Sequence, residues 1–269
     1  MAFHKPITTY RDHGHMLACG MDPKGVMAEL TGRRSGYSRG KGGSMHMFSK
    51  EKAFYGGHGI VGANVPLGAG LAFANKYRGN DHVSLTYFGD GAANQGQVYE
   101  AFNMAKLWRL PAIFVIENNK YAMGTATERS SATTNFSERG SSFDIPGEQV
   151  DGMDVRAVKA AGDRVVKWAR AGNGPYILEM LTYRYRGHSM ADPELYRLKE
   201  EIEQARSRDA IAKLKQHMID SGMLDEAGYD EVAARVDRGV VAAVEFADKS
   251  PEPSLDTLYD KVTSEPANG

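Results

Sequence analysis

The stretch VSLTYFGDGAANQGQVYEAFNMAKLWRLPAIFVIENNKY, residues 83–121, decides the fold. Residues 83–88 and 112–117 are short apolar runs rich in β-branched and aromatic side chains, which predicts two buried parallel strands. Residues 95–108 between them are expected to form an amphipathic helix, because apolar residues recur at i, i+4 and i+7 from Val98. A strand, a helix and a strand of these lengths form one βαβ unit.

The rest of the chain repeats this alternation of helices and strands. Residues 64–78, which are rich in small side chains, and residues 156–171 predict helices, while residues 176–183 predict a further strand. We therefore expect an α/β fold class with a mostly parallel sheet flanked by helices. Residues 1–193 are expected to form this domain. Residues 194–269 are expected to form a C-terminal helical extension, packed on the same domain or on a partner subunit.

The composition excludes several classes of protein. Hydrophobic residues make up 42% of the 269 residues, charged residues make up 25%, and the formal net charge is −1. This balance lacks the positive charge of nucleic-acid-binding proteins, and no apolar run approaches the roughly 18 residues of a membrane span. We therefore expect no nucleic acid and no membrane as partners. Cys19 is the only cysteine, which excludes an internal disulfide and favours a reducing compartment.

The sequence Gly89-Asp90-Gly91 directly follows a predicted strand. Open α/β sheets bind ligands at the carboxyl ends of their strands, where glycines allow close approach and a following helix N-terminus favours anions. The carboxylate of Asp90 would repel such an anion unless a cation lies between them. Mg²⁺ is suited to this place, because it takes oxygen ligands from one or two protein groups and from a diphosphate.

The next predicted strand leads into Asn119 and Tyr121. Because neighbouring parallel strands end side by side, Asn119 can supply an amide oxygen beside Asp90, and the backbone carbonyl of Tyr121 a third ligand. Taken alone, each of the two pieces is more typical of an ordinary turn. The joint pattern, GDG and NN separated by 26 residues that fit a helix and a strand, favours a binding site.

The pattern GDG(x26)NN is the diphosphate and metal motif of thiamine-diphosphate enzymes. The sequence around it resembles the α subunits of the pyruvate dehydrogenase E1 component, within the thiamine-diphosphate-dependent 2-oxo acid dehydrogenases. The resemblance runs from about residue 7 to about residue 260 and implies a thiamine-diphosphate-binding fold. It also rests on YRDHG (10–14), ELTGRRSGYSRGKGGSMHMF (29–48), YGGHGIVGANVPLGAG (55–70), PGEQVDGMD (146–154) and TYRYRGHSMADP (182–193).

The resemblance implies two cofactors, thiamine diphosphate and Mg²⁺. Asp90 and Asn119 would bind Mg²⁺ through side-chain oxygens, and Tyr121 through its backbone carbonyl. Gly91 and Ala92 would offer backbone contacts to the diphosphate.

Other matched positions imply further contacts with the cofactor. Tyr10 and Arg11 match the family's cofactor-contacting pair, and a guanidinium suits phosphate oxygens. Gly59 and Val61 fall in the stretch that holds the aminopyrimidine and thiazolium rings, where the side chain of Val61 would help to bend the cofactor.

The segment TYRYRGHSM supplies the catalytic candidates. His188 matches a loop histidine near the cofactor, where it would bind phosphate or move protons, and Arg184 lies close to it in the sequence. The alternative for His188 is a solvated loop residue. Ser189 corresponds to the residue that is phosphorylated in mitochondrial relatives.

The family's reaction implies several partners. Such enzymes decarboxylate a small-molecule 2-oxo acid, here pyruvate, and transfer the acetyl unit to the lipoyl group of the E2 acyltransferase. The glutamate that activates the cofactor lies on a separate E1 β subunit, and nothing in this chain matches it. We therefore expect an α2β2 heterotetramer. The expected location is the bacterial cytoplasm, or the mitochondrial matrix if an N-terminal segment was removed.

Two alternatives remain open. Acetoin or a branched-chain 2-oxo acid would be the substrate in related E1 α subunits. Family members also carry a segment before YRDHG with a histidine facing the substrate pocket, and the chain begins too late to contain it. We therefore expect a shortened chain, and a catalytically silent cofactor-binding or assembly module is the second alternative.

Overall fold

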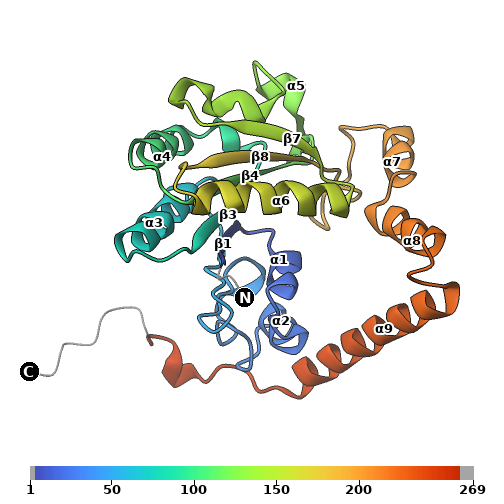
Figure 1. The fold of residues 1–269 in the computed structure, drawn as a ribbon. Coiled ribbons are helices and arrows are strands. Elements are labelled where there is room, and N and C mark those ends of the chain that lie inside the picture. The colour runs from blue at the N-terminus through green and yellow to red at the C-terminus, as the bar shows by residue number, and fades with distance from the viewer. Residues whose placement is uncertain (1–3, 261–269) are drawn as a thin grey trace, which may run out of the picture.

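The computed structural model of the chain describes residues 4–260. Residues 1–3 of the predicted domain 1–193 and residues 261–269 of the predicted extension 194–269 lie outside the described part. The centre of the structure is a six-stranded sheet, covered by helices on both faces (Figure 1). Along the sheet the strands are ordered β2 (Gly57–His58), β1 (His4–Thr9), β3 (Val83–Gly89), β4 (Ala112–Asn118), β8 (Tyr176–Leu181) and β7 (Gly147–Asp151).

All pairings in this sheet are parallel within the described residues. The predicted α/β fold with a mostly parallel sheet flanked by helices is therefore confirmed. The register places Gly89 of β3 beside Glu117 of β4, and Asn118 of β4 beside Leu181 of β8. The strands consequently end at one level, which brings their following residues together.

Alternate residues of the central strands face opposite layers. Phe114 and Ile116 of β4 belong to a core cluster with α3 (Asn64–Tyr77) and α4 (Gly96–Leu107). Ile113 and Val115 belong to a second cluster with α6 (Val155–Arg170). Because both faces are covered, the strands read as continuous apolar runs rather than as an alternating pattern.

A close approach of α3 to the sheet depends on Gly68. A Cβ atom at this position would lie 2.0 Å from Oγ1 of Thr86 on β3, so only glycine allows the contact. This close approach explains why α3 is rich in small residues. It also sets the position of α3 against the sheet beneath the candidate site.

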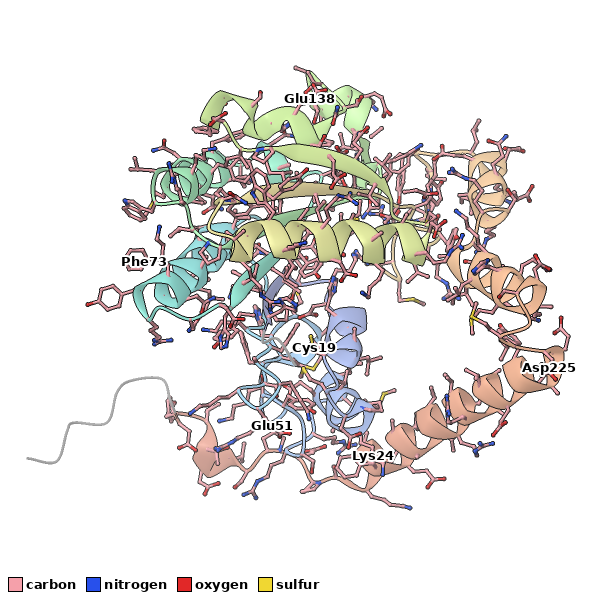
Figure 2. All side chains as sticks on the ribbon, viewed as in Figure 1. Cys19, Lys24, Glu51, Phe73, Glu138 and Asp225 are labelled. Atoms are coloured by element: carbon pink, nitrogen blue, oxygen red, sulfur yellow. The ribbon has the colours of Figure 1, made fainter. Side chains whose placement is uncertain are left out.

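The first part of the chain forms a separate layer below the sheet. It contains α1 (His13–Ala18), α2 (Pro23–Leu30), the 3₁₀ turn η1 (Gly43–Met45) and a long glycine-rich loop. A third apolar cluster holds this layer together, and the partly buried Cys19 packs against it (Figure 2). Its buried members are Met16, Met21, Val26, Met47 and Phe54.

Short elements connect β3, β4 and β7. A 3₁₀ turn, η2 (Ala92–Asn94), precedes α4, and the antiparallel strands β5 (Tyr121–Ala122) and β6 (Thr125–Ala126) follow β4. They lead through α5 (Thr127–Ser130) and η3 (Phe136–Phe143) to β7.

Between residues 194 and 260, the C-terminal part contains three helices and a short 3₁₀ turn, η4 (Leu255–Thr257). The expected helical run from residue 194 is interrupted: α7 covers Lys199–Arg206 and α8 covers Ala210–Asp220, with Asp209 capping α8 through the backbone N–H groups of two residues. The last helix, α9 (Glu226–Lys249), runs back to pack against α2. Among the described residues, no helix combines the length and apolarity needed to cross a membrane.

Candidate functional site

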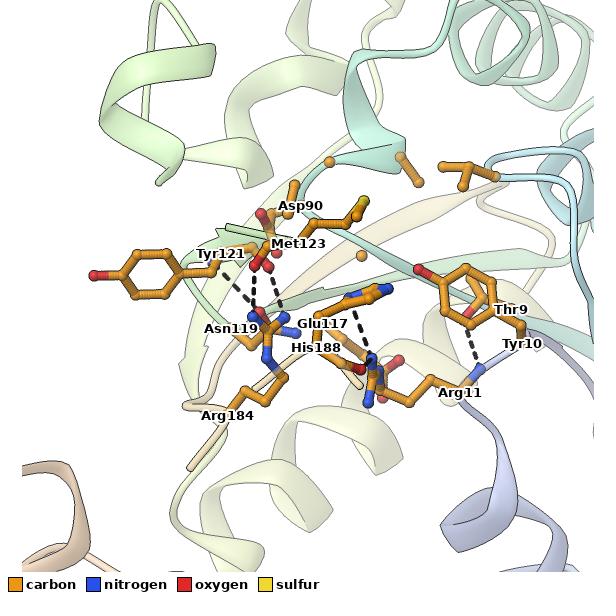
Figure 3. A pocket seen from close by; sticks show the side chains of 15 residues that line it. Thr9, Tyr10, Arg11, Asp90, Glu117, Asn119, Tyr121, Met123, Arg184 and His188 are labelled. Atoms are coloured by element: carbon orange, nitrogen blue, oxygen red, sulfur yellow. Dashed lines mark hydrogen bonds between the residues drawn. The ribbon is translucent and has the colours of Figure 1, made fainter. Parts of the chain in front are cut away.

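Four neighbouring strands end at the same edge of the sheet, and the residues after them surround a cavity of about 300 Å³ (Figure 3). β1 leads to Tyr10, β3 to Asp90, β4 to Asn119 and β8 to Arg184. Of the residues predicted for the site, the cavity is lined by Tyr10, Arg11, Val61, Asp90, Gly91, Ala92, Asn119, Tyr121, Arg184 and His188.

Asp90 is the most unusual polar group of this cavity. Its side chain is only 2% exposed, and its Oδ2 atom is buried without a hydrogen-bond partner. Burial raises the pKa of this carboxyl group above its usual value, because the charged form is poorly solvated. A cation beside Oδ2 would supply the missing partner, so the residue fits the predicted metal site.

The turn after β4 supplies the other two oxygens of the predicted set. Lys120 and Met123 have positive φ angles of 71° and 53°, which fold the chain back after Asn119. The Oδ1 atom of Asn119 accepts a hydrogen bond of 3.3 Å from the backbone N–H of Tyr121. The carbonyl group of Tyr121 accepts a bond of 3.0 Å from Nη1 of Arg184.

The three predicted oxygen ligands would suit a hard cation rather than zinc. Within residues 4–260, no three His, Cys, Asp or Glu side chains gather closely enough to hold a metal ion. One carboxylate, one amide oxygen and one carbonyl oxygen suit Mg²⁺, which takes few protein ligands and completes its shell with water and phosphate oxygens.

Arg184 acts on the backbone of this turn. Its Nη1 and Nη2 atoms donate to the carbonyl oxygens of Tyr121 and Met123, the second at 2.6 Å, and Nη2 also donates to the hydroxyl of Tyr196. The guanidinium therefore orients a predicted metal-ligating carbonyl. This contact with the backbone was not foreseen from the sequence, which placed Arg184 among the catalytic groups.

His188 also lines the cavity and lies beside Arg11. Nη2 of Arg11 donates to the backbone carbonyl of His188 at 2.8 Å and lies 3.4 Å from the ring atom Nδ1. Burial lowers the pKa of His188, and the nearby cations Arg11 and Arg184 lower it further. The imidazole is therefore neutral near pH 7, and its ring can accept a proton or hydrogen bond.

A carboxylate holds the loop that carries His188. Oδ2 of Asp192 accepts a hydrogen bond of 2.6 Å from the backbone N–H of His188, and Oδ1 accepts one from Glu194. These two backbone bonds, in that order, are the main reasons why the pKa of Asp192 falls to about 2. Ser189 is exposed next to this bonded segment.

The two residues predicted to contact the cofactor rings, Val61 and Gly59, differ in their position relative to the cavity. Val61 lines the cavity, and its backbone carbonyl accepts a hydrogen bond from the amide of Gln97 on α4. Gly59 is not among the lining residues; a Cβ there would lie 3.2 Å from the ring of His46.

Sequence reasoning missed four lining residues, Thr9, Glu117, Ala122 and Met123, and named Gly89 only as part of the GDG motif. Most are direct neighbours of motif residues, so the register of the strand ends was the signal for them. Glu117 is different because it pairs with His15 of α1 at 3.0 Å. Burial lowers the pKa of His15, but the hydrogen bond and charge of Glu117 outweigh this and raise it.

Glycine at position 91 is required by the hairpin that follows β4. A Cβ atom at Gly91 would lie 2.6 Å from the Cβ of Ala122, so a larger residue would push the Asp90 turn away from the Asn119 turn. The GDG turn therefore packs directly against the hairpin that follows Asn119.

Residues 5–256 match the family model of the dehydrogenase E1 component. The chain belongs to the dehydrogenase E1 component family. This match covers all four strand ends of the cavity. Membership of this family implies the use of thiamine diphosphate.

Individual relatives agree with this assignment. The chain is 65% identical over 257 residues to a protein of Rhizobium meliloti (strain 1021), and 58% identical over 257 residues to one of Zymomonas mobilis. It is 50% identical over 256 residues to one of Rickettsia prowazekii. All three are named pyruvate dehydrogenase E1 component subunit alpha. The alignments cover 95% of this chain and 74%, 72% and 78% of the three relatives, respectively.

Proposed function

We propose that the chain is the α subunit of a pyruvate dehydrogenase E1, which decarboxylates pyruvate and transfers the acetyl unit to the lipoyl group of an E2 acyltransferase. The names of its relatives and its place in the dehydrogenase E1 component family support this. The observation that carries the proposal is the buried, unpartnered Oδ2 atom of Asp90 beside the Asn119 turn. An isolated buried carboxylate is costly, and a bound cation offsets that cost.

The residues of the cavity divide into two groups by chemistry. Asp90, Asn119 and the carbonyl of Tyr121 would hold Mg²⁺, which would in turn hold the diphosphate of thiamine diphosphate. Arg11 would add a cation to the phosphate end, since its guanidinium lines the cavity.

The remaining lining groups would surround the rings and the substrate. When bound, thiamine diphosphate supplies the electron sink for decarboxylation of a 2-oxo acid. Val61 would provide an apolar part of the wall, and Tyr10 lies edge-on to the ring of His188, with 6.1 Å between the ring centroids. The neutral imidazole of His188 can exchange a proton with groups inside the cavity.

A complete active site requires a second chain in this proposal. The carboxylate that faces the aminopyrimidine in this family belongs to the E1 β subunit, and we propose an α2β2 heterotetramer that works in the bacterial cytoplasm. The single cysteine and the bacterial relatives support that location.

The proposal is tested by mixing the chain with a matching β subunit, thiamine diphosphate and Mg²⁺, and following dye reduction driven by pyruvate, acetoin or branched-chain 2-oxo acids. We expect turnover that requires pyruvate and both subunits, and that stops when Mg²⁺ is chelated. Preference for acetoin or a branched-chain acid would exclude pyruvate as the substrate. Mg²⁺-dependent cofactor binding without any turnover would identify a silent binding module.

A further inference from the structure

The glycine-rich loop after α2 is organised by one buried carboxylate. Glu29, in the last turn of α2, has a fully buried side chain. Its Oε2 atom accepts hydrogen bonds from the backbone N–H groups of Ser38 at 2.8 Å and Gly40 at 2.9 Å. Its Oε1 atom accepts from Gly42 at 2.7 Å and Gly43 at 3.1 Å. Four loop N–H groups therefore converge on one side chain, as they would on a bound anion.

This arrangement explains why the loop is rich in glycine. A Cβ atom at Gly36 would lie 2.3 Å from Oε2 of Glu29, and one at Gly42 would lie 2.1 Å from the carbonyl oxygen of His46. The loop backbone thus wraps directly around the carboxylate. The bonds fix six consecutive residues, 38–43, without a helix or strand.

Contacts lead from this loop to the wall of the cavity. The hydroxyl of Ser38 donates a hydrogen bond of 2.5 Å to the backbone carbonyl of His46. Nδ1 of His46 lies 3.2 Å from the carbonyl oxygen of Gly57, and the His46 ring lies against Gly59. Gly57 begins β2, the strand that leads to Val61 in the lining.

We propose that Glu29 is a positioning residue for the cofactor cavity. Its carboxylate folds the loop, the loop places His46, and His46 aligns residues 57–60, which lead to Val61 in the wall beside the cofactor rings. This inference rests on the proposed function. The other end of the cavity, at Asp90 and Asn119, follows β3 and β4, and neither residue is among the four loop groups that donate to Glu29. Glu29 therefore acts on one end of the cavity only.

The substitution Glu29→Gln tests the role of the second acceptor oxygen. Glutamine has nearly the same size, but its amide nitrogen is a donor and cannot accept from two loop N–H groups. Two of the four hydrogen bonds from the loop are lost, and the new amide N–H groups face backbone N–H groups of the loop in a buried place. We expect the wall to lose its alignment while the sheet stays folded.

The measurement compares two ligands in the chain assembled with its β subunit. Thiamine diphosphate contacts both ends of the cavity, whereas magnesium pyrophosphate contacts only the Asp90 end. We expect E29Q to bind thiamine diphosphate about tenfold more weakly, the equivalent of one hydrogen bond to a charged group, and magnesium pyrophosphate as the wild type does. Tryptic cleavage at Arg33, Arg34, Arg39 and Lys41 should accelerate.

The matched control is Glu51→Gln, because Glu51 lies in the same layer (Figure 2). Its side chain is 82% exposed. It should change neither ligand affinity nor the cleavage rate. Equal weakening of both ligands in E29Q would show a general loss of structure and overturn the inference, as would unchanged affinity for both. If the wild-type assembly bound no thiamine diphosphate, the proposed function would fail, and the inference with it.

Discussion

The two ends of the cavity are built in different ways. The Asp90 end consists of short turns that directly follow β3 and β4, so the register of the sheet places its groups. The wall around Val61 and the loop around His188 are long irregular segments, held by buried or bonded carboxylates such as Glu29 and Asp192. Rigid strand ends suit a cation that demands fixed geometry, whereas loops can follow the irregular outline of an organic ligand.

The largest expected effect is at the Asp90 end. Asp90→Asn keeps the size of the side chain but removes its charge and one acceptor oxygen, so we expect Mg²⁺-dependent binding of thiamine diphosphate to weaken about 100-fold. The ligand-free variant should unfold at a higher temperature than the wild type, because a buried unpartnered carboxyl group has been removed. Titration calorimetry and thermal unfolding measure the two effects.

Asp144→Asn is the matched control, since the side chain of Asp144 is 95% exposed and its φ of 56° is one that asparagine tolerates. It should alter neither cofactor binding nor thermal unfolding appreciably. If Asp90→Asn kept the wild-type requirement for Mg²⁺, the cation would have to be bound elsewhere, and the contrast between the two ends would disappear.

A smaller effect is expected at Arg184, which connects the loop of His188 to the strand-end turn at the Asp90 end. It comes from a loop but hydrogen-bonds the carbonyl groups of Tyr121 and Met123 in the strand-end turn. Arg184→Lys keeps the charge but cannot bridge both carbonyls, and Arg184→Gln loses the charge as well. We expect both variants to need about tenfold more Mg²⁺ for half-maximal cofactor binding.

The control for Arg184 lies in the comparison of the two variants. If lysine restored wild-type Mg²⁺ dependence and glutamine did not, charge alone would matter, and the orientation of the carbonyl groups would be irrelevant. Arg164→Gln, which removes an exposed ion pair with Glu148, serves as a reference and should leave the Mg²⁺ requirement unchanged.

The contrast between the two ends also explains what the sequence could predict. The strands at 83–88 and 112–117 were visible as apolar runs, and the pairing of Asp90 with Asn119 followed from their parallel register. By contrast, the role of Glu29 was invisible, because its four partners are backbone N–H groups and carry no side-chain signal.

Other gaps have equally physical causes. The contact of Glu117 with His15 joins residues far apart in the sequence, and no local pattern encodes it. The strands β1 and β7 were missed because HKPITT and GEQVD contain few apolar residues: β1 is buried by the elements around it, and β7 buries only Val150. The bond from Arg184 to Tyr121 depends on how a loop folds back, which periodicity does not reveal.

The smallest effect on cofactor binding is expected at Asp12. Like Asp90, it is a buried carboxyl group without a full set of partners, and neither of its oxygen atoms is hydrogen-bonded. Unlike Asp90, it does not line the cavity, so no cation explains it. Burial is the main cause that raises its pKa from 3.8 to about 7. Between pH 3.8 and about pH 7, Asp12 keeps its proton in the folded chain and releases it in the unfolded chain. The contribution of Asp12 to stability is therefore fully present below about pH 4 and lost as the pH rises through about 7.

Asp12→Asn removes this titration and distinguishes the two buried carboxyl groups. We expect the unfolding temperature of the variant, relative to the wild type, to rise between pH 5 and pH 8, while its affinity for thiamine diphosphate stays within about twofold. Thermal unfolding at several pH values, with Asp144→Asn as the control, measures the difference. A pH-independent difference would mean that Asp12 is ionised throughout that range in the folded chain. Strong loss of cofactor binding would mean that an unpartnered carboxyl group outside the lining still shapes the site. The effect of Asp90 on binding could then no longer be ascribed to its place in the cavity.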